Sequence, residues 1–98
     1  MLDTLTSEDF LPLLQEPFET SLGDTPVVLT LARVDVKDER YSRPGARLAF
    51  SLIFHGPPEP LLPQGTYSMK NSTLGELALF TVPLGPGEEG LRYEVVFS

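Results

Sequence analysis

The chain has 98 residues and a mass of 10.8 kDa, which is enough for one domain of ordinary size but not for two. It carries 14 acidic and 7 basic residues, a net charge of −7, and no cysteine. The missing cysteine excludes disulfides, thiolate metal sites and cysteine nucleophiles. The negative charge opposes binding to nucleic acid and to anionic membranes, so we predict neither as a partner.

Targeting signals are not visible in the sequence. The first ten residues, MLDTLTSEDF, lack a basic stretch followed by an apolar run, and no run of 18 apolar residues occurs in the chain. We therefore expect a cytoplasmic protein, or one that is exported only as part of an assembly.

Residues 1–15 predict a helical cap. Thr6 or Ser7 can serve as the N-cap, and the acidic residues that follow complement the positive end of the helix dipole. Phe10 begins an apolar face with helical spacing, whereas Pro12 limits the helix to about two turns because it lacks an amide donor.

Residues 17–98 predict six strands, because apolar side chains recur at every second position in six segments separated by glycine and proline. These segments are Phe18–Leu22, Val27–Val36, Leu48–His55, Gly65–Lys70, Glu76–Pro83 and Leu91–Phe97. The short connections exclude parallel crossovers, so the pairing should be antiparallel. Several strands are apolar on both faces, which favours a closed or two-layered arrangement. We predict one mainly all-β domain over residues 1–98, a small antiparallel β-barrel or sandwich with the helical cap.

His55 is the only histidine and ends the most apolar strand. A catalytic interpretation would use it as a general base together with Glu59 or Ser51. Ser51 lies four residues earlier on the same strand, about 13 Å away along an extended chain, which is beyond hydrogen-bond reach. We therefore interpret His55 as an exposed residue at a strand end, and we predict no catalytic residue.

Metal and cofactor motifs are also missing. The adjacent carboxylates Glu8–Asp9, Asp38–Glu39 and Glu88–Glu89 are not part of an oxygen-ligand loop. The segment 85–87 has a proline where a phosphate-binding loop would need amide donors. We predict neither a metal nor a cofactor.

Charge is distributed unevenly along the chain. The first 24 residues contain six acids and no base, whereas five of the seven bases fall between positions 33 and 47. We interpret four residues of this basic segment as contacts to a protein partner or to a second copy of the chain: Arg40, Tyr41, Arg43 and Arg47. The alternative is a solvated mixed-charge loop, because three acids lie among these bases.

Several motifs recur in an order that resembles a known family. The chain opens with Leu2-Asp3-Thr4-Leu5-Thr6 and Asp9-Phe10, continues with L-P-Q-G-T-Y at 62–67, and ends with Y-E-V-V-F at 93–97. This order resembles a family of small bacterial domains of about 100 residues that carries only the label "domain of unknown function". The resemblance implies a bacterial β-domain, loosely associated with phage-tail-like collar or fibre proteins, and it assigns no activity and no site residue.

The function that we predict from the sequence is a non-enzymatic module for protein interaction or assembly, phage-tail-like if the resemblance extends that far. Two alternatives stay open at this point. One is a β-barrel that binds a small ligand in its interior. The other is an enzyme that uses His55 as its general base.

Overall fold

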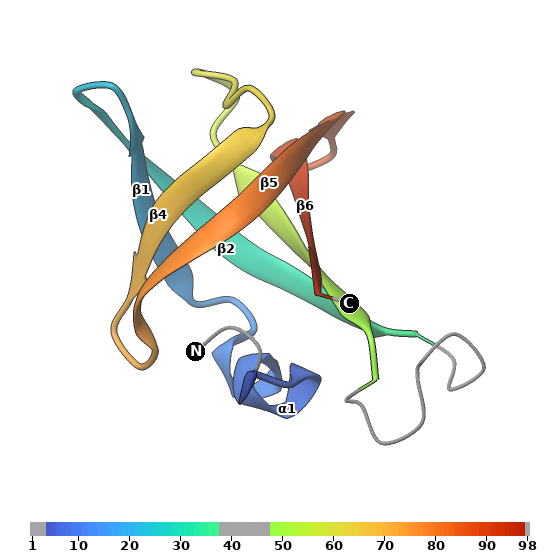
Figure 1. The fold of residues 1–98 in the computed structure, drawn as a ribbon. Helices are drawn as coiled ribbons and strands as arrows, with labels where there is room; N and C mark the ends of the chain where they lie inside the picture. Colours follow the sequence, from blue (N-terminus) through green and yellow to red (C-terminus); the bar gives the residue numbers. More distant parts are fainter. Residues whose placement is uncertain (1–3, 38–47, 98) are drawn as a thin grey trace.

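Alternating apolar side chains form the inner surface of a closed antiparallel β-barrel, which has a short helical segment at one end (Figure 1). This computed structural model describes residues 4–37 and 48–97. Its strands are β1 (Pro17–Leu22), β2 (Thr25–Val36), β3 (Phe50–Gly56), β4 (Gly65–Asn71), β5 (Gly75–Gly87) and β6 (Gly90–Phe97), in the order β1-β2-β3-β6-β5-β4 around the barrel. The six predicted strands are confirmed, and they close into a barrel.

Two long strands form the corners of the barrel. The first half of β2 pairs with β1 and its second half pairs with β3, while β5 pairs first with β4 and then with β6. The register shifts between Leu31 and Arg33 in β2, and between Pro83 and Gly85 in β5. Such bulges bend a strand, so that one strand can belong to two sheets that cross.

The strand β5 extends beyond its predicted end at Pro83. Pro86 pairs with Leu91 and Gly87 pairs with Gly90, so β5 and β6 form a hairpin joined by the two residues Glu88 and Glu89. Gly85, Pro86 and Gly87, which locally favour a loop between two strands, are therefore part of β5. This is possible because the bulge and the hairpin end tolerate residues that would interrupt a regular ladder.

The interior of the barrel is filled by the protein's own side chains. Apolar residues from all six strands, together with Phe10, Leu13 and Leu62 from the connecting segments, are at most 5% exposed. The strand residues in this core are Phe18, Val27, Leu29, Leu31, Phe50, Leu52, Phe54, Met69, Leu77, Leu79, Tyr93, Val95 and Phe97.

The predicted helical cap is confirmed, as α1 (Ser7–Phe10) followed by the 3-10 turn η2 (Leu11–Leu13). Thr6 is the N-cap, and its backbone N–H donates to the Asp9 carboxylate at 2.8 Å. Phe10 is fully buried, and its ring centroid lies 5.8 Å from that of Phe50 and 5.4 Å from that of Phe97. The segment thus covers one barrel end. Within the described ranges, the helices are too short and too polar to cross a membrane.

The opposite end of the barrel is covered by the connection between β3 and β4, seen at the top of Figure 1. Leu62 in this connection is fully buried, and its backbone N–H donates to the hydroxyl of Tyr93 at 3.0 Å. The Tyr67 hydroxyl donates to the carbonyl of Pro63 at 2.5 Å. These bonds hold an otherwise irregular segment against the core.

The seam between β1 and β4 has the least backbone pairing. Its ladder consists of one pair, Glu19 opposite Lys70. The buried side chain of Asn71 adds a second connection, because its amide nitrogen donates to the Pro17 carbonyl at 3.1 Å. Its amide oxygen accepts the backbone N–H groups of Thr73 and Leu74 at 2.9 and 3.1 Å.

Candidate functional site

The predicted contact residues Arg40, Tyr41, Arg43 and Arg47 lie outside the described residues, so their role stays a prediction. The basic side chain that precedes them on β2 is already engaged. Arg33 forms an ion pair with Asp35, with 2.7 Å between Nη2 and Oδ2. The hydrogen bond to Asp35 and the charge of its carboxylate raise the pKa of Arg33 above its usual value.

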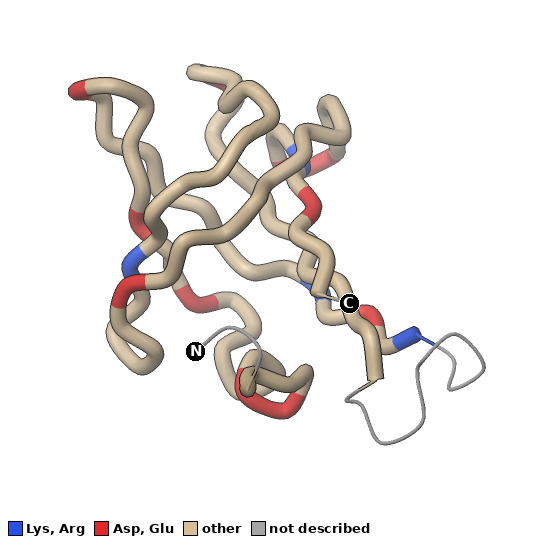
Figure 2. Tube along the Cα trace, in the orientation of Figure 1, with Lys and Arg blue, Asp and Glu red and all other residues tan. Residues whose placement is uncertain are grey.

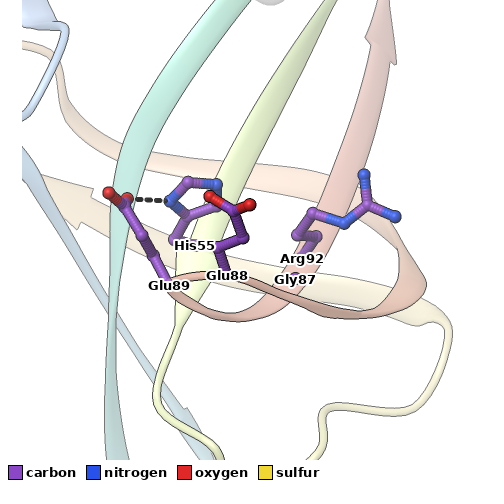
Figure 3. Close-up of a pocket in the computed structure, with 5 residues that line it drawn as sticks. All are labelled: His55, Gly87, Glu88, Glu89 and Arg92. Carbon is purple, nitrogen blue, oxygen red and sulfur yellow. Dashed lines mark hydrogen bonds and ion pairs between the residues drawn. The ribbon is translucent and has the colours of Figure 1, made fainter.

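Two open depressions meet at His55 on the outer wall of the barrel. The first has a volume of about 400 Å³ and is lined by His55, Gly87, Glu88, Glu89 and Arg92 (Figure 3). The second has a volume of about 480 Å³ and is lined by Gln15, Val28, Thr30, His55, Gly56, Pro57 and Glu89. Because His55 and Glu89 line both depressions, this pair of side chains is the centre of the candidate site.

His55 and Glu89 come together although they are 34 positions apart in the sequence. His55 lies near the end of β3, and Glu89 lies in the turn between β5 and β6. The distance from His55 Nδ1 to Glu89 Oε2 is 2.8 Å, and the two side chains are 25% and 73% exposed. With Nδ1 occupied, Nε2 is the ring nitrogen that is left for a ligand. An exposed pair of this kind contributes less than about 1 kcal/mol to stability.

Glycine positions the turn that carries Glu89. Gly90 has a φ of +117°, which side chains rarely adopt, and a Cβ atom there would collide with the carbonyl oxygen of Gly56. A Cβ atom on Gly56 would in turn lie 2.7 Å from the Leu29 side chain. The glycine at position 90 therefore lets the hairpin approach β3 closely beside Glu89 and His55.

Arg92 contributes its aliphatic stem more than its charge. A Cβ atom on Gly87 would lie 2.7 Å from Arg92 Cδ, so the stem covers Gly87 closely. Figure 3 shows that the guanidinium extends away from His55 and Glu89. Arg92 Nε is buried and has no hydrogen-bond partner in the described part of the chain.

The chemistry of the depression follows from these orientations. Glu88 and Glu89 are exposed carboxylates beside an imidazole, so the surface accepts hydrogen bonds and cationic groups. Over residues 4–37 and 48–97, no three His, Cys, Asp or Glu side chains gather as they would around a metal ion.

The partner of His55 differs from the two residues that the sequence suggested. Glu59 and Ser51 were considered because they are near in sequence, whereas the hydrogen bond is made by Glu89. The pairing of β3 with β6 places His55 opposite Arg92, and the adjoining hairpin turn then brings Glu89 to the imidazole. The sequence analysis missed Glu89 and Arg92 because the register between β3 and β6 brings together residues that are far apart in the sequence, and no local pattern predicts that register.

Large apolar side chains are also exposed on the outer wall. Phe80 on β5 is 52% exposed, and Val96 on β6 is 58% exposed. Others with more than a third of their surface exposed are Leu11, Leu14, Val28, Val36, Leu48, Leu61 and Leu84. Figure 2 shows acidic residues distributed around the barrel and few basic ones in the described part of the chain.

The structure defines a small closed β-barrel whose interior is filled by its own side chains. The chain belongs to the family described as "Domain of unknown function (DUF6916)", which matches residues 5–97. No curated protein and no solved structure matches the chain. The family predicted from the motifs is thereby confirmed, and the association with phage-tail-like proteins stays a prediction.

Proposed function

We propose that this domain is a non-enzymatic module for protein interaction. The observation that carries the proposal is the exposure of Phe80 and Val96, which are 52% and 58% exposed on a wall whose inner face is fully packed. Exposed apolar side chains at a protein surface gain free energy when a partner covers them. The filled interior supports an outer contact over the alternative of a ligand inside the barrel.

Charge supports a partner that carries basic residues. The whole chain has a net charge of −7, and the carboxylates Glu88 and Glu89 stand beside the depression at His55. Complementary charge accelerates association and makes binding sensitive to salt. The basic segment with Arg40, Arg43 and Arg47 is the exception, and we propose that it contacts an acidic partner surface.

The experiment is capture of partners by a tagged domain in its native cells, with crosslinking and quantitative mass spectrometry. The variant with Arg40→Gln, Arg43→Gln and Arg47→Gln should lose the partners that bind through this basic segment, and raising the salt concentration should weaken their capture by the wild-type chain. The matched control is Ser21→Glu, Gln64→Glu and Ser72→Glu, which changes the net charge equally at exposed polar positions. Equal enrichment by both variants and the wild type would contradict the role of the basic segment.

A more specific version of the protein-interaction proposal is a role in the assembly of a larger particle. If the domain is part of a phage-tail-like particle, it should sediment with that particle after detergent lysis and be detected there by a specific antibody. A domain found only in the supernatant would leave a soluble partner as the proposal.

One observation favours an enzyme as the second candidate function. His55 Nδ1 is 2.8 Å from a Glu89 oxygen, as in sites where a carboxylate orients a general base. We expect equal rates of activated-ester hydrolysis for the wild type, His55→Ala and Glu89→Gln. A shared loss of rate in both variants would support the enzyme instead.

A further inference from the structure

Among the described strands, the first half of β5 has a neighbour on one edge only. Residues Gly75–Thr81 pair with β4, but the ladder between β5 and β6 begins at Val82 opposite Glu94. β6 pairs with β3 from Leu91 to Phe97 on its other edge. In the described ranges, the edge of β5 from Glu76 to Thr81 that faces β6 is therefore unpaired. Figure 1 shows β5 and β6 diverging from their hairpin toward the C-terminal end.

This edge is a rim of backbone groups and not an opening into the core. The inward side chains on either side, Leu77, Leu79 and Val95, are at most 4% exposed. Alternate residues of a strand direct their N–H and C=O groups to opposite edges, so about half of the residues in Glu76–Thr81 present theirs to the unpaired side. Such groups are the template on which another strand can pair.

The outer face beside this edge is apolar and lacks protection. Ala78 and Phe80 are exposed on β5, and Val96 is exposed on β6 across the gap. Native edge strands are commonly protected by lysine, proline or a bulge. From Glu76 to Val82 the sequence is ELALFTV, with neither lysine nor proline, and the bulge lies further along at Pro83 to Gly85.

An acidic residue lies at each end of this edge. Glu76 lies at one end, where its carboxylate accepts a hydrogen bond from the Ser68 hydroxyl at 2.9 Å and the residue pairs with Lys70 of β4. Glu94 lies at the other end, two residues after Arg92. A second copy of the chain would bring the same net charge of −7, and this repulsion opposes its binding. A segment with lysine or arginine at its ends fits the charge better.

We propose that the unpaired edge of β5, Glu76–Thr81, binds an extended segment of a partner protein by strand addition. The partner segment carries apolar residues at alternate positions beside Phe80 and Val96, and basic residues that complement the net charge of −7. Backbone hydrogen bonds supply affinity and the alternate side chains supply specificity. This inference rests on the proposed interaction function and names its surface and the chemistry of the partner.

The experiment is an NMR titration of the full chain with the capped peptide Lys-Thr-Val-Thr-Val-Thr-Lys, whose sequence is the same in both directions. Amide signals of Glu76–Val82 should shift, and their hydrogen exchange should slow. A peptide with N-methyl groups on alternate amides keeps the side chains but loses donors, and it should bind at least about tenfold more weakly.

The variant is Phe80→Lys, which places a charge beside the edge at an exposed position and should weaken peptide binding at least about tenfold. Its matched control is Val28→Lys, because Val28 is 49% exposed and lies on β2. Val28→Lys should bind as the wild type does. Two-dimensional spectra of both variants without peptide establish that they are folded.

Three results would overturn the inference: no binding at millimolar peptide, shifts centred elsewhere than β5, or equal binding of the N-methylated peptide. A dimer of the free chain that Phe80→Lys abolishes would also overturn it, because the occupant would then be a second copy. The interaction function itself fails separately, when the tagged domain enriches no partner in cells.

Discussion

At the scale of single residues, Asn71 holds the seam between β1 and β4. The seam has one backbone pair, and the Asn71 side chain adds a bond to Pro17 while it accepts two amides of the following turn. Asn71 is 2% exposed, and its three bonds are partly buried. A buried polar group that loses its partner costs free energy comparable to the bond itself.

We therefore predict that Asn71→Ala lowers the free energy of unfolding by about 2–3 kcal/mol, because it leaves a carbonyl and two amides without a partner. Ser72→Ala, at the exposed neighbouring position, should change it by less than about 0.5 kcal/mol. Urea denaturation followed by circular dichroism measures both values. Equal stability of the two variants would mean that the backbone pair alone closes the seam.

At the scale of elements, the helical segment α1–η2 is part of the core and not an appendage. Phe10 contacts the rings of Phe50 and Phe97, which are themselves stacked with 4.6 Å between centroids. These two rings come from the start of β3 and the end of β6. The segment therefore packs against two strands at the barrel end where β3 begins and β6 ends.

Phe10→Ala should lower the free energy of unfolding by about 3–5 kcal/mol, the usual cost of removing a buried aromatic side chain. Leu11→Ala is the control, because Leu11 is 45% exposed in the adjacent turn, and it should cost about 1 kcal/mol or less. Denaturant titration of both variants tests this. A small loss for Phe10→Ala would show that the barrel closes without the segment.

The close approach of the β5–β6 hairpin to β3 depends on Gly90. Gly90→Ala should cost more than Gly23→Ala, since both positions have positive φ but nothing lies within 4 Å of a Cβ atom on Gly23, whereas Gly90 faces the Gly56 carbonyl. We expect about 1 kcal/mol for Gly23→Ala and at least about 2 kcal/mol for Gly90→Ala. NMR shifts of the His55 ring should change only in Gly90→Ala. Identical costs would place the strain in the φ angle alone.

At the scale of the whole molecule, acidic charge is the dominant electrostatic feature. The net charge of −7 is distributed over a small barrel, as Figure 2 shows for the described residues. Like charges at such a density repel one another in the compact state, and salt screens this repulsion.

The melting temperature should therefore rise as NaCl is increased from about 10 to about 150 mM, over which the screening length falls from about 30 to about 8 Å. Glu59→Gln combined with Glu88→Gln should raise the melting temperature at low salt and reduce its dependence on salt. Differential scanning calorimetry measures both. A melting temperature that falls with salt would mean that ion pairs such as Arg33–Asp35 outweigh the repulsion.

The local sequence pattern was sufficient to predict the strands and the helical cap, but it was insufficient to predict the candidate site at His55 and Glu89. Alternation correctly predicted a strand at Glu76–Pro83, in which Leu77 and Leu79 are buried and Phe80 is exposed. It failed for β5 beyond Pro83, because a bulge and a hairpin stabilise residues that locally favour a loop. The Glu89 partner of His55 depends on that same hairpin and could not be derived from spacing.

By itself, the sequence determined the number of strands, their antiparallel pairing, the helical cap and the exclusion of cysteine chemistry, because each of these depends on residue type, on connection length or on a period of two or 3.6 residues. Only the tertiary structure decided that the strands close into a barrel, that Glu89 meets His55, and that no described strand pairs with one edge of the first half of β5. These features depend on register between distant strands. Register is determined by bulges, glycine contacts and core packing acting together, and no short segment of the chain contains that information.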